Sequence, residues 1–596
     1  MKLNKYILAC CTLISMASCE TDFLQRRPLT EVTEDNFFKT INDLESYTNG
    51  FYQYIGASTS DGGTDNESVN TNGNTTTQIM MGKISSANIG GWDDWDELRT
   101  YNYFLSHTGQ VTGEQTDVDH YIGIARFFRA RFYADKVKNY SDVPWYDKAL
   151  SAEDPDMYKG ADSRNTVMDK VLEDLEFSVE HIKEDLGSRT RINRWAALAS
   201  MARICLYEGT YRKYHPELKL ENDYTRFLNK AVWACEEIMT KGGFSIYGSS
   251  GDDYRNLFKM PSLDNNPEII LQRAYDKDLG IGNDTHSVLD WAWGLSNSLA
   301  ETYLMADGTR FTDLPDYHQK TFTQMFENRD PRMKATFAFP GFKQTQSGAP
   351  YRPELPSGGY SQLKFYPDEA QRGDAFGMNY TSLPIFRYAE ILLIYAEAKA
   401  ELGTLKQEDL ENSITLIRKR VGMKALNMEE ANASPDPILE KQYPNVTGPN
   451  KGVILEIRRE RRVEMACEGL RWQDIQRWGA GKLYAQFQEG IYVEQFGAFD
   501  VTGDGVEDIA VLPSPEDESA IAGLPEEVRE NLTKYYLMKD GEEQDIYLSE
   551  GDHGHICFTR NKGVTLEFKD PQYYYLPIPQ KQTLLNPNLK QPFGWE

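Results

Sequence analysis

Three glutamates in the last third of the chain, Glu460, Glu464 and Glu468, are four residues apart and would share one helical face. Carboxylates paired on one face can serve as general acid and general base in hydrolysis. Five arginines are interleaved with them: Arg458, Arg461, Arg462, Arg471 and Arg477. These are enough to neutralise every carboxylate. We therefore predict an ion-pair network that fixes helix packing, and no enzymatic activity, with a hydrolase as the less favoured alternative.

A second group of carboxylates has the spacing of a metal-binding loop. Asp500, Thr502, Asp504 and Asp508 occupy positions 1, 3, 5 and 9 of an EF-hand-type loop, with a glycine at the sharp turn. The bidentate glutamate expected at position 12 is replaced by Val511. Two interpretations stay open, a structural Ca²⁺ site or an Asp/Gly turn without an ion. We expect no other cofactor.

Cys19 follows a segment typical of lipoprotein signal peptides. Lys2 and Lys5 give a positive start, residues 6–15 an apolar run, and residues 16–18 (MAS) end in small side chains. The alternative is a transmembrane anchor, but this run of about ten apolar residues is too short for a hydrocarbon core that needs about 20. We predict that residues 1–18 are removed and that Cys19 carries the lipid.

The charge of the chain limits its partners. Loss of residues 1–18 would move the formal charge from −27 to −29. Nucleic acids and anionic membranes demand basic surface, so neither is an expected partner, apart from the membrane contact made by the lipid. Beyond Cys19 the chain has four cysteines, of which Cys205 and Cys235 fall in neighbouring predicted helices. They either form a disulfide or remain buried thiols.

Helical periodicity is concentrated in two blocks, at about 95–241 and 384–483. In the first, Ile124, Phe128 and Phe132 recur at i, i+4 and i+8. Paired helices in which small and aromatic residues alternate resemble tetratricopeptide units, although no strict repeat period is kept. The segments at about 57–94, 242–383 and 484–580 are rich in loop-forming residues. We expect these to be surface loops on a mainly α scaffold with little β-structure.

Short motifs along the mature chain carry a family resemblance. They are residues 19–31 (CETDFLQRRPLTE) with 36–38 (NFF), 140–144 (YSDVP), 328–332 (NRDPR), 387–397 (RYAEILLIYAE), 458–464 (RRERRVE) with 468–478 (EGLRWQDIQRW), 575–579 (YLPIP) and 586–595 (NPNLKQPFGW). In this order they resemble the SusD/RagB family of outer-membrane nutrient-binding lipoproteins. Ser141 stands where that family usually has glycine.

The resemblance implies a single fold over residues 19–596, with tetratricopeptide-like helical pairs forming an α/α superhelical scaffold. It also implies a lipid-anchored outer-membrane protein that faces the cell exterior. Its helical pairs would pack against a SusC-like TonB-dependent transporter, and the opposite, loop-built face would bind an oligosaccharide. The protein would hand this glycan to the transporter; peptide cargo is the alternative.

Aromatic residues in loops are the expected ligand contacts, because sugar rings stack on flat side chains. We predict that Trp92 is exposed, and that Trp291 and Trp293 point the same way from an extended segment. Each could instead be a core aromatic. Asp65, Asn66 and Arg372 lie in loops from which they could bond sugar hydroxyls, and the 345–380 loop around Tyr360 and Arg372 is a second location.

Overall fold

The apolar stripes of the N-terminal half fold into long helices. The computed structural model describes residues 37–68, 75–151, 153–289, 294–373 and 375–596. The helices up to residue 241 are α2 (Ile41–Asn49), α3 (Thr75–Met80), α4 (Trp95–His107), α5 (Gln115–Tyr140), α6 (Arg164–His181), α7 (Arg194–Tyr214) and α8 (Tyr224–Lys241). Helix covers 45% of the structure and strand 9%, so the predicted mainly helical class is confirmed.

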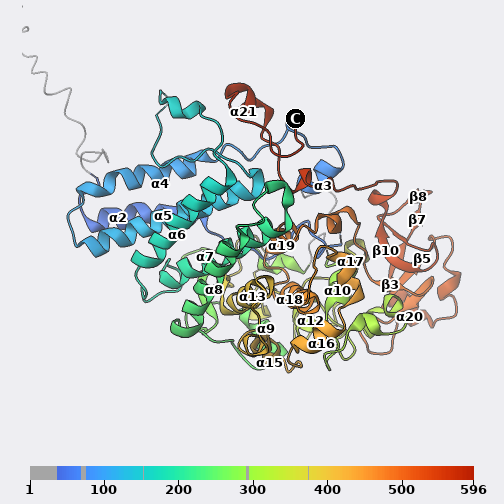
Figure 1. The fold of residues 1–596 in the computed structure, drawn as a ribbon. Coiled ribbons are helices and arrows are strands. Elements are labelled where there is room, and N and C mark those ends of the chain that lie inside the picture. Colours follow the sequence, from blue (N-terminus) through green and yellow to red (C-terminus); the bar gives the residue numbers. More distant parts are fainter. Residues whose placement is uncertain (1–36, 69–74, 152, 290–293, 374) are drawn as a thin grey trace, which may run out of the picture.

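Close approach between helices explains why small residues recur in them. The predicted stripe of α5, Ile124, Phe128 and Phe132, is buried. A Cβ added at Gly209 of α7 would come within 2.6 Å of the Leu228 side chain in α8. The absence of a side chain at this position therefore lets α7 and α8 pack directly, and Figure 1 shows the two helices side by side.

A second helical layer follows in the centre of the molecule. It contains α13 (Tyr388–Glu401), α14 (Gln407–Glu411), α15 (Ile414–Arg420), α16 (Met428–Ala433), α17 (Pro437–Gln442), α18 (Lys451–Glu464) and α19 (Arg471–Arg477). Helix α13 packs against both α8 and α18. The chain turns sharply after α18, where Cys467 and Gly469 have φ angles of 65° and 74°. This turn separates α18 from α19 and presents backbone N–H groups to neighbouring loops.

Short elements connect the two helical layers. They are α9 (Gly251–Leu257), β1 (Ile269–Arg273), α10 (Asn297–Thr302), α11 (Phe322–Met325), α12 (Arg332–Thr336) and β2 (Leu383–Arg387). Strands β1 and β2 are antiparallel, with Ile269 opposite Arg387 and Arg273 opposite Leu383. Because β2 continues directly into α13, this pairing fixes Arg387 beside the core.

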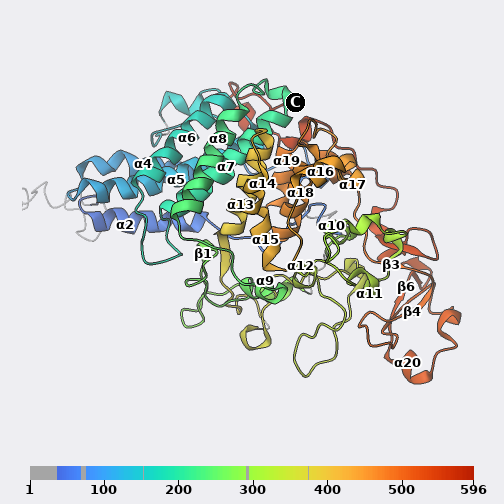
Figure 2. The ribbon, with the colours of Figure 1, turned by 60° about the horizontal axis from the view of Figure 1, so that its bottom comes forward.

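The segment after residue 484 contains small sheets in place of the expected loops. Its elements are β3 (Tyr492–Val493), β4 (Gly497–Phe499), β5 (Ile509–Leu512), α20 (Glu526–Asn531), β6 (Thr533–Tyr536), β7 (Met538–Lys539), β8 (Glu542–Glu543), β9 (Ile546–Leu548), β10 (Gly554–Phe558) and finally α21 (Gln580–Leu585). Two of the sheets have three strands each, in the orders β3-β10-β9 and β4-β5-β6. In the second sheet, β5 and β6 are parallel. Figure 2 shows this strand-rich part at the end of the molecule away from α2 and α4.

The four cysteines of the described chain are free thiols, and three of them, Cys205, Cys235 and Cys467, are buried. Burial raises the pKa of Cys205 to about 12, so this thiol is inert at neutral pH. In the described part of the chain, no helix has the length and apolar character needed to span a bilayer.

Candidate functional site

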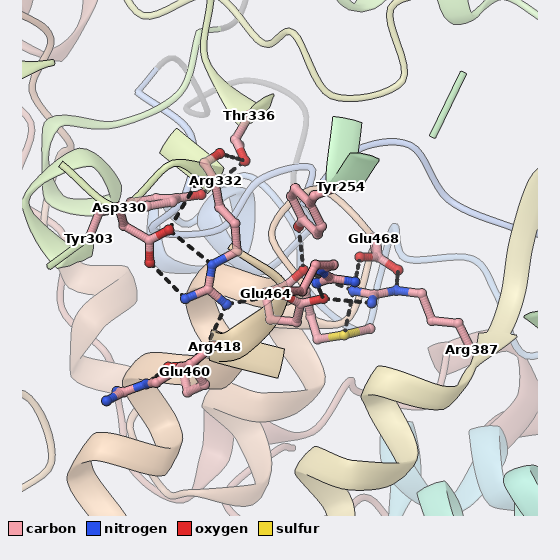
Figure 3. A network of polar contacts seen from close by, with 12 residues as sticks. Tyr254, Tyr303, Asp330, Arg332, Thr336, Arg387, Arg418, Glu460, Glu464 and Glu468 are labelled. Atoms are coloured by element: carbon pink, nitrogen blue, oxygen red, sulfur yellow. Dashed lines mark hydrogen bonds and ion pairs between the residues drawn. The ribbon is translucent and has the colours of Figure 1, made fainter. Parts of the chain in front are cut away.

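The three glutamates at the end of α18 and in the turn after it lie in a buried charge network (Figure 3). Glu464 accepts hydrogen bonds from Arg387 Nη1 at 2.7 Å and Arg332 Nη1 at 3.0 Å, and also pairs with Arg420. Burial by itself would raise the pKa of Glu464, but Arg420, Arg387 and Arg332 hold it well below its usual range. A carboxylate held ionised in this way is a poor general acid.

The two neighbouring carboxylates, Glu460 and Glu468, are also paired with two cationic side chains each. Glu460 accepts from Arg332 Nη1 at 2.6 Å and from Arg418 Nε at 2.7 Å. Glu468 accepts from Arg387 Nη2 at 2.6 Å and from Lys364 Nζ at 2.7 Å. The network therefore joins α12, β2, α15 and α18, which is the structural role that the sequence predicted.

The predicted partners of these glutamates were wrong. The interleaved arginines bind other acids: Arg458 pairs with Glu401, Arg461 with Asp474, Arg462 and Arg471 with Asp65, and Arg477 with Glu397. The reason is helical geometry, because arginines placed between the glutamates point to other faces of the same helix. The glutamates instead take cations from α12, β2, α15 and the Lys364 loop.

Trp92, predicted to be exposed, is only 4% exposed. Its ring packs edge-on against Trp95 and Tyr140, with centroid distances of 5.4 and 4.8 Å. Lys136 Nζ lies 5.5 Å from the Trp92 ring centroid and 5.1 Å from that of Trp95, and donates to the Trp92 carbonyl oxygen at 3.1 Å. Trp92 therefore belongs to an aromatic cage around a buried lysine, whose pKa is lowered by desolvation.

Asp65 and Asn66, predicted to face sugar hydroxyls, are buried too. Arg471 donates to both oxygens of Asp65 at 2.7 Å, and Arg462 Nε donates to the side-chain oxygen of Asn66 at 2.8 Å. Asp61 fixes the same loop by accepting from the backbone N–H groups of Cys467 and Gly469. The polar loop folds inward because the cations of α18 and α19 require counter-charges there.

Tyr360 is fully buried, and its hydroxyl group donates to Asn297 at 3.2 Å. It is therefore not a surface platform. Arg372 is partly buried and donates to the carbonyl oxygen of Gln344 at 3.2 Å, with its guanidinium over the Tyr366 ring. Of the predicted ligand residues that the structure describes, only Arg372 keeps substantial contact with solvent.

Trp291, Trp293 and Cys19 lie outside the described residues. The residues that flank the tryptophan pair are fixed, however. Ser68 N donates to Gly294 O at 2.9 Å, Ser296 N donates to Asn66 O at 3.0 Å, and Leu295 N donates to Tyr360 O at 2.7 Å. We call these three segments in contact, residues 61–68, 294–297 and 357–360, the loop junction. The described residues next to the polar segment and to the tryptophan segment, Ser68 and Gly294, therefore lie side by side.

The carboxylates predicted to bind a metal do converge. Oxygens of Asp500, Asp504 and Asp508 lie within 4.8 Å of one another. Asp508 is buried and is also 3.3 Å from Arg352 Nε, while Asp504 is exposed. Thr502 N donates to Asp508 at 2.9 Å, which curls the loop around the acids. Since one arginine cannot neutralise three carboxylates, the group can hold a cation.

Comparison with known proteins identifies the class to which this fold and these sites belong. Residues 247–595 match the model of the SusD family, and residues 22–206 match a second model described as "Starch-binding associating with outer membrane". The chain belongs to the SusD family, which consists of non-catalytic binding proteins.

Individual relatives are distant but cover most of the chain. SusD-like protein P2 of Formosa agariphila is 22% identical over 505 residues, which are 79% of this chain and 89% of that protein. The crystal structure of a SusD-like protein from Bacteroides fragilis superposes with a TM-score of 0.67 at 22% identity, covering 96% of this chain and all of that one. A laminarin-binding SusD-like protein superposes with a TM-score of 0.54 at 16% identity, covering 94% and 100%. These structural similarities concern the fold.

Proposed function

We propose that this protein is a cell-surface lipoprotein that captures an oligosaccharide and delivers it to a SusC-like TonB-dependent transporter. Its SusD-family membership supports this role, as does the starch-binding, outer-membrane description of the model matched by residues 22–206. Two of the structurally similar proteins are described as carbohydrate binding and laminarin binding. The anchor is a lipid on Cys19, facing the cell exterior.

The loop junction is the observation that supports the location of the binding site. A hydrogen bond from Ser68 to Gly294 holds together the described residues next to two segments, 69–74 and 290–293. The first segment is rich in Asn, Gly and Thr, and the second contains Trp291 and Trp293. Amide side chains and indole rings are the groups that suit a sugar, since sugar rings stack on indole and hydroxyls bond to amides. We therefore assign the ligand face to this place, with Arg372 as a further contact.

A panel of oligosaccharides titrated by calorimetry tests this function. The double variant Trp291→Ala/Trp293→Ala should bind the best oligosaccharide about tenfold more weakly, because roughly 1.4 kcal/mol of lost contact is enough. Its thermal midpoint should stay unchanged. Trp233→Ala is the matched control, since this tryptophan is 39% exposed on the scaffold helix α8.

Two outcomes would contradict the proposal in different ways. Binding of peptides but of no oligosaccharide would favour the alternative cargo. Unchanged glycan affinity in the double variant would place the ligand face elsewhere, and the 345–380 loop around Arg372 would be the next candidate.

The acidic loop at residues 500–508 adds a structural role for Ca²⁺ to this proposal. Asp500, Thr502, Asp504 and Asp508 would supply the oxygen ligands. The loop connects β4 and β5, so a bound ion would stabilise the strand-rich part and take no part in cargo binding.

A further inference from the structure

Two of the eight histidines, far apart in the sequence, come together in the fold. His318 lies in η7 (Tyr317–Gln319), a short 3-10 helix, and His555 lies in β10. Their ring centroids are 6.5 Å apart, in an edge-on arrangement. Strand β3 pairs with β10 at His555 and also packs against η7. The fold therefore holds the two imidazoles near each other, where the segment between α10 and α11 meets the strand-rich part.

The hydrogen bonds of the two rings fix which nitrogen carries the proton. His555 Nδ1 lies 3.0 Å from the carbonyl oxygen of Gly490, and His318 Nδ1 lies 2.9 Å from Oε1 of Glu301. Carbonyl and carboxylate oxygens only accept hydrogen bonds, so Nδ1 is the donor in both rings. In the neutral imidazole, Nε2 then keeps its lone pair. Histidines that bind a metal are oriented in this way, by an Nδ1–H group donated to a carbonyl or carboxylate oxygen.

The Nε2 atom of His555 is an unused acceptor in the interior. It is buried and has no hydrogen-bond partner among the described residues. The whole side chain is enclosed as well, because His555 is only 9% exposed. Burying a polar atom without a partner is costly, so this nitrogen is expected to bind a further group. A water molecule would satisfy one such nitrogen, whereas two neighbouring imidazoles with matching tautomers suit a metal ion.

A carboxylate supplies a third donor. Glu489 is exposed and precedes Gly490, whose carbonyl oxygen accepts from His555. The hydrogen bond to Glu301 raises the pKa of His318, and the charges of Glu301 and Glu489 add to this increase. Glu489 is therefore near both rings. Two imidazoles and one carboxylate are a ligand set that Zn²⁺ accepts, with water in the fourth position.

We propose that His318, His555 and Glu489 bind a divalent transition-metal ion, with Zn²⁺ as the expected occupant. Imidazole nitrogen suits such ions, whereas Ca²⁺ takes oxygen ligands, so this site is distinct from the 500–508 loop. Two imidazoles on one zinc ion have ring centroids about 5–6 Å apart, because each zinc–nitrogen bond is about 2.0–2.1 Å long. The exposed His318 side chain would close the remaining gap by a shift of about 1 Å.

The ion would stabilise the backbone beside the loop junction. Asn297 N donates to Glu489 O at 2.9 Å, and Ile491 N donates to Gly358 O at 2.8 Å. Residues 489–491 therefore contact two of the three segments that form the junction. A metal that ties η7 to β10 would fix the strand-rich part to these segments, whatever cargo the protein binds.

Zinc titration by calorimetry tests the site in the purified protein, free of any histidine tag. The variants His318→Gln and His555→Gln should each bind Zn²⁺ at least about tenfold more weakly than the wild type, since each removes one protein ligand. His553→Gln is the matched control, because this exposed histidine is close to His555 in the sequence and should leave the affinity unchanged. Glu489→Gln should weaken binding severalfold, and Glu494→Gln, also at an exposed position, should not.

Cobalt and thermal unfolding provide two further measurements. Co²⁺ in place of Zn²⁺ should give the visible absorption of a four-coordinate ion in the wild type and in His553→Gln, and lose it in His318→Gln. Zn²⁺ should raise the thermal midpoint of the wild type but not that of His318→Gln, because only the native site binds the ion. Asp504→Asn should keep this Zn²⁺ response, which separates the site from the 500–508 loop.

Two results would overturn the site. Equal Zn²⁺ affinity in the wild type, His318→Gln and His555→Gln would show that the ion binds elsewhere. Failure of the wild type to bind Zn²⁺ would leave His555 Nε2 to a water molecule. Because His318 is exposed, His318→Gln tests the site even if His555→Gln does not fold. Neither result affects the proposed function, since the oligosaccharide titrations need no ion.

Discussion

Glu464 is the residue whose substitution should report most directly on the buried network. In Glu464→Gln, three arginines would lose an ionised partner, and breaking a buried pair typically costs about 3–5 kcal/mol. Urea unfolding should show this loss, while Glu429→Gln, at an exposed position on α16, should be neutral. Equal stability of the two variants would contradict the network's role.

The pH dependence of this contribution follows from the direction in which the pKa moves. Glu464 has a native pKa below its ordinary value of 4.5. Its stabilising contribution should therefore be complete above that ordinary value and disappear as the pH falls towards the native pKa. Acid unfolding of Glu464→Gln should accordingly be less steep than that of the wild type.

Trp92 should affect stability, in contrast to the exposed role that the sequence suggested. Trp92→Ala removes a buried ring and one wall of the Lys136 cage, and truncating a buried aromatic costs about 3–5 kcal/mol. The thermal midpoint should fall clearly, whereas that of Trp233→Ala should hardly move. An unaltered melt for Trp92→Ala would show that the ring is dispensable for the core.

Residue-level errors of the sequence analysis share one physical cause. A loop rich in Ser, Thr, Asn and Gly predicts exposure, but Asp65 is buried because Arg471, 406 positions further along the chain, needs a counter-charge. Composition within a window contains no information about such a partner. The α18 glutamates could be assigned a structural role because their neighbourhood is visibly charge-balanced, but their partners were again remote.

At the scale of elements, long helices were predictable and short strands were not. The stripe on α5 repeats over several turns, and periodicity over that length is a strong signal. The strands after residue 490 are two to five residues long, too short to show a clear alternation.

The loop junction should respond to pH through Glu67. Burial raises the pKa of Glu67 to about 7, with Asp61 adding to the increase, while Gly63 N and Ser60 Oγ oppose it by donating hydrogen bonds. A carboxyl whose native pKa is raised stabilises the folded state less as the pH rises from about 4.5 to 7. Within this range, each rise of one pH unit lowers the free energy of unfolding by about 1.4 kcal/mol. The thermal midpoint should fall over this range.

The variant Glu67→Gln provides the comparison. It keeps an acceptor for the Gly63 N–H group but cannot ionise, so its midpoint should fall less over the same pH range. If the thermal midpoints of the two proteins change with pH in parallel, Glu67 is not the cause of the pH dependence.

The 500–508 loop offers a test of ion binding within the strand-rich part. Ca²⁺ should raise the thermal midpoint of the wild type, because binding to the native state adds about 2.7 kcal/mol at one hundred times Kd. Asp504→Asn should abolish the effect at little cost without the ion, since Asp504 is exposed. Asp540→Asn, in the β7–β8 turn, is the control. A Ca²⁺ effect that persists in Asp504→Asn would locate the ion elsewhere.

For the whole molecule, the charge and the anchor act in opposite directions. The mature chain carries a formal charge of −29 once residues 1–18 are removed, so electrostatics would repel it from an anionic outer surface. The lipid predicted on Cys19 would then be needed to anchor the protein directly in the membrane. Two or more acyl chains anchor stably, whereas one anchors marginally, so the wild type should resist a high-salt wash.

Cys19→Ala should therefore change localisation completely. Without the thiol there is no group to which the lipid can be attached. The precursor should therefore stay uncleaved, and the protein should be missing from the outer membrane. Cys11→Ala, within the apolar run of the same signal, is the matched control and should be processed normally. Protease treatment of intact cells should digest the wild type and the control, because both would face outward. Surface-exposed, processed Cys19→Ala protein would refute lipidation at this residue as the means of attachment.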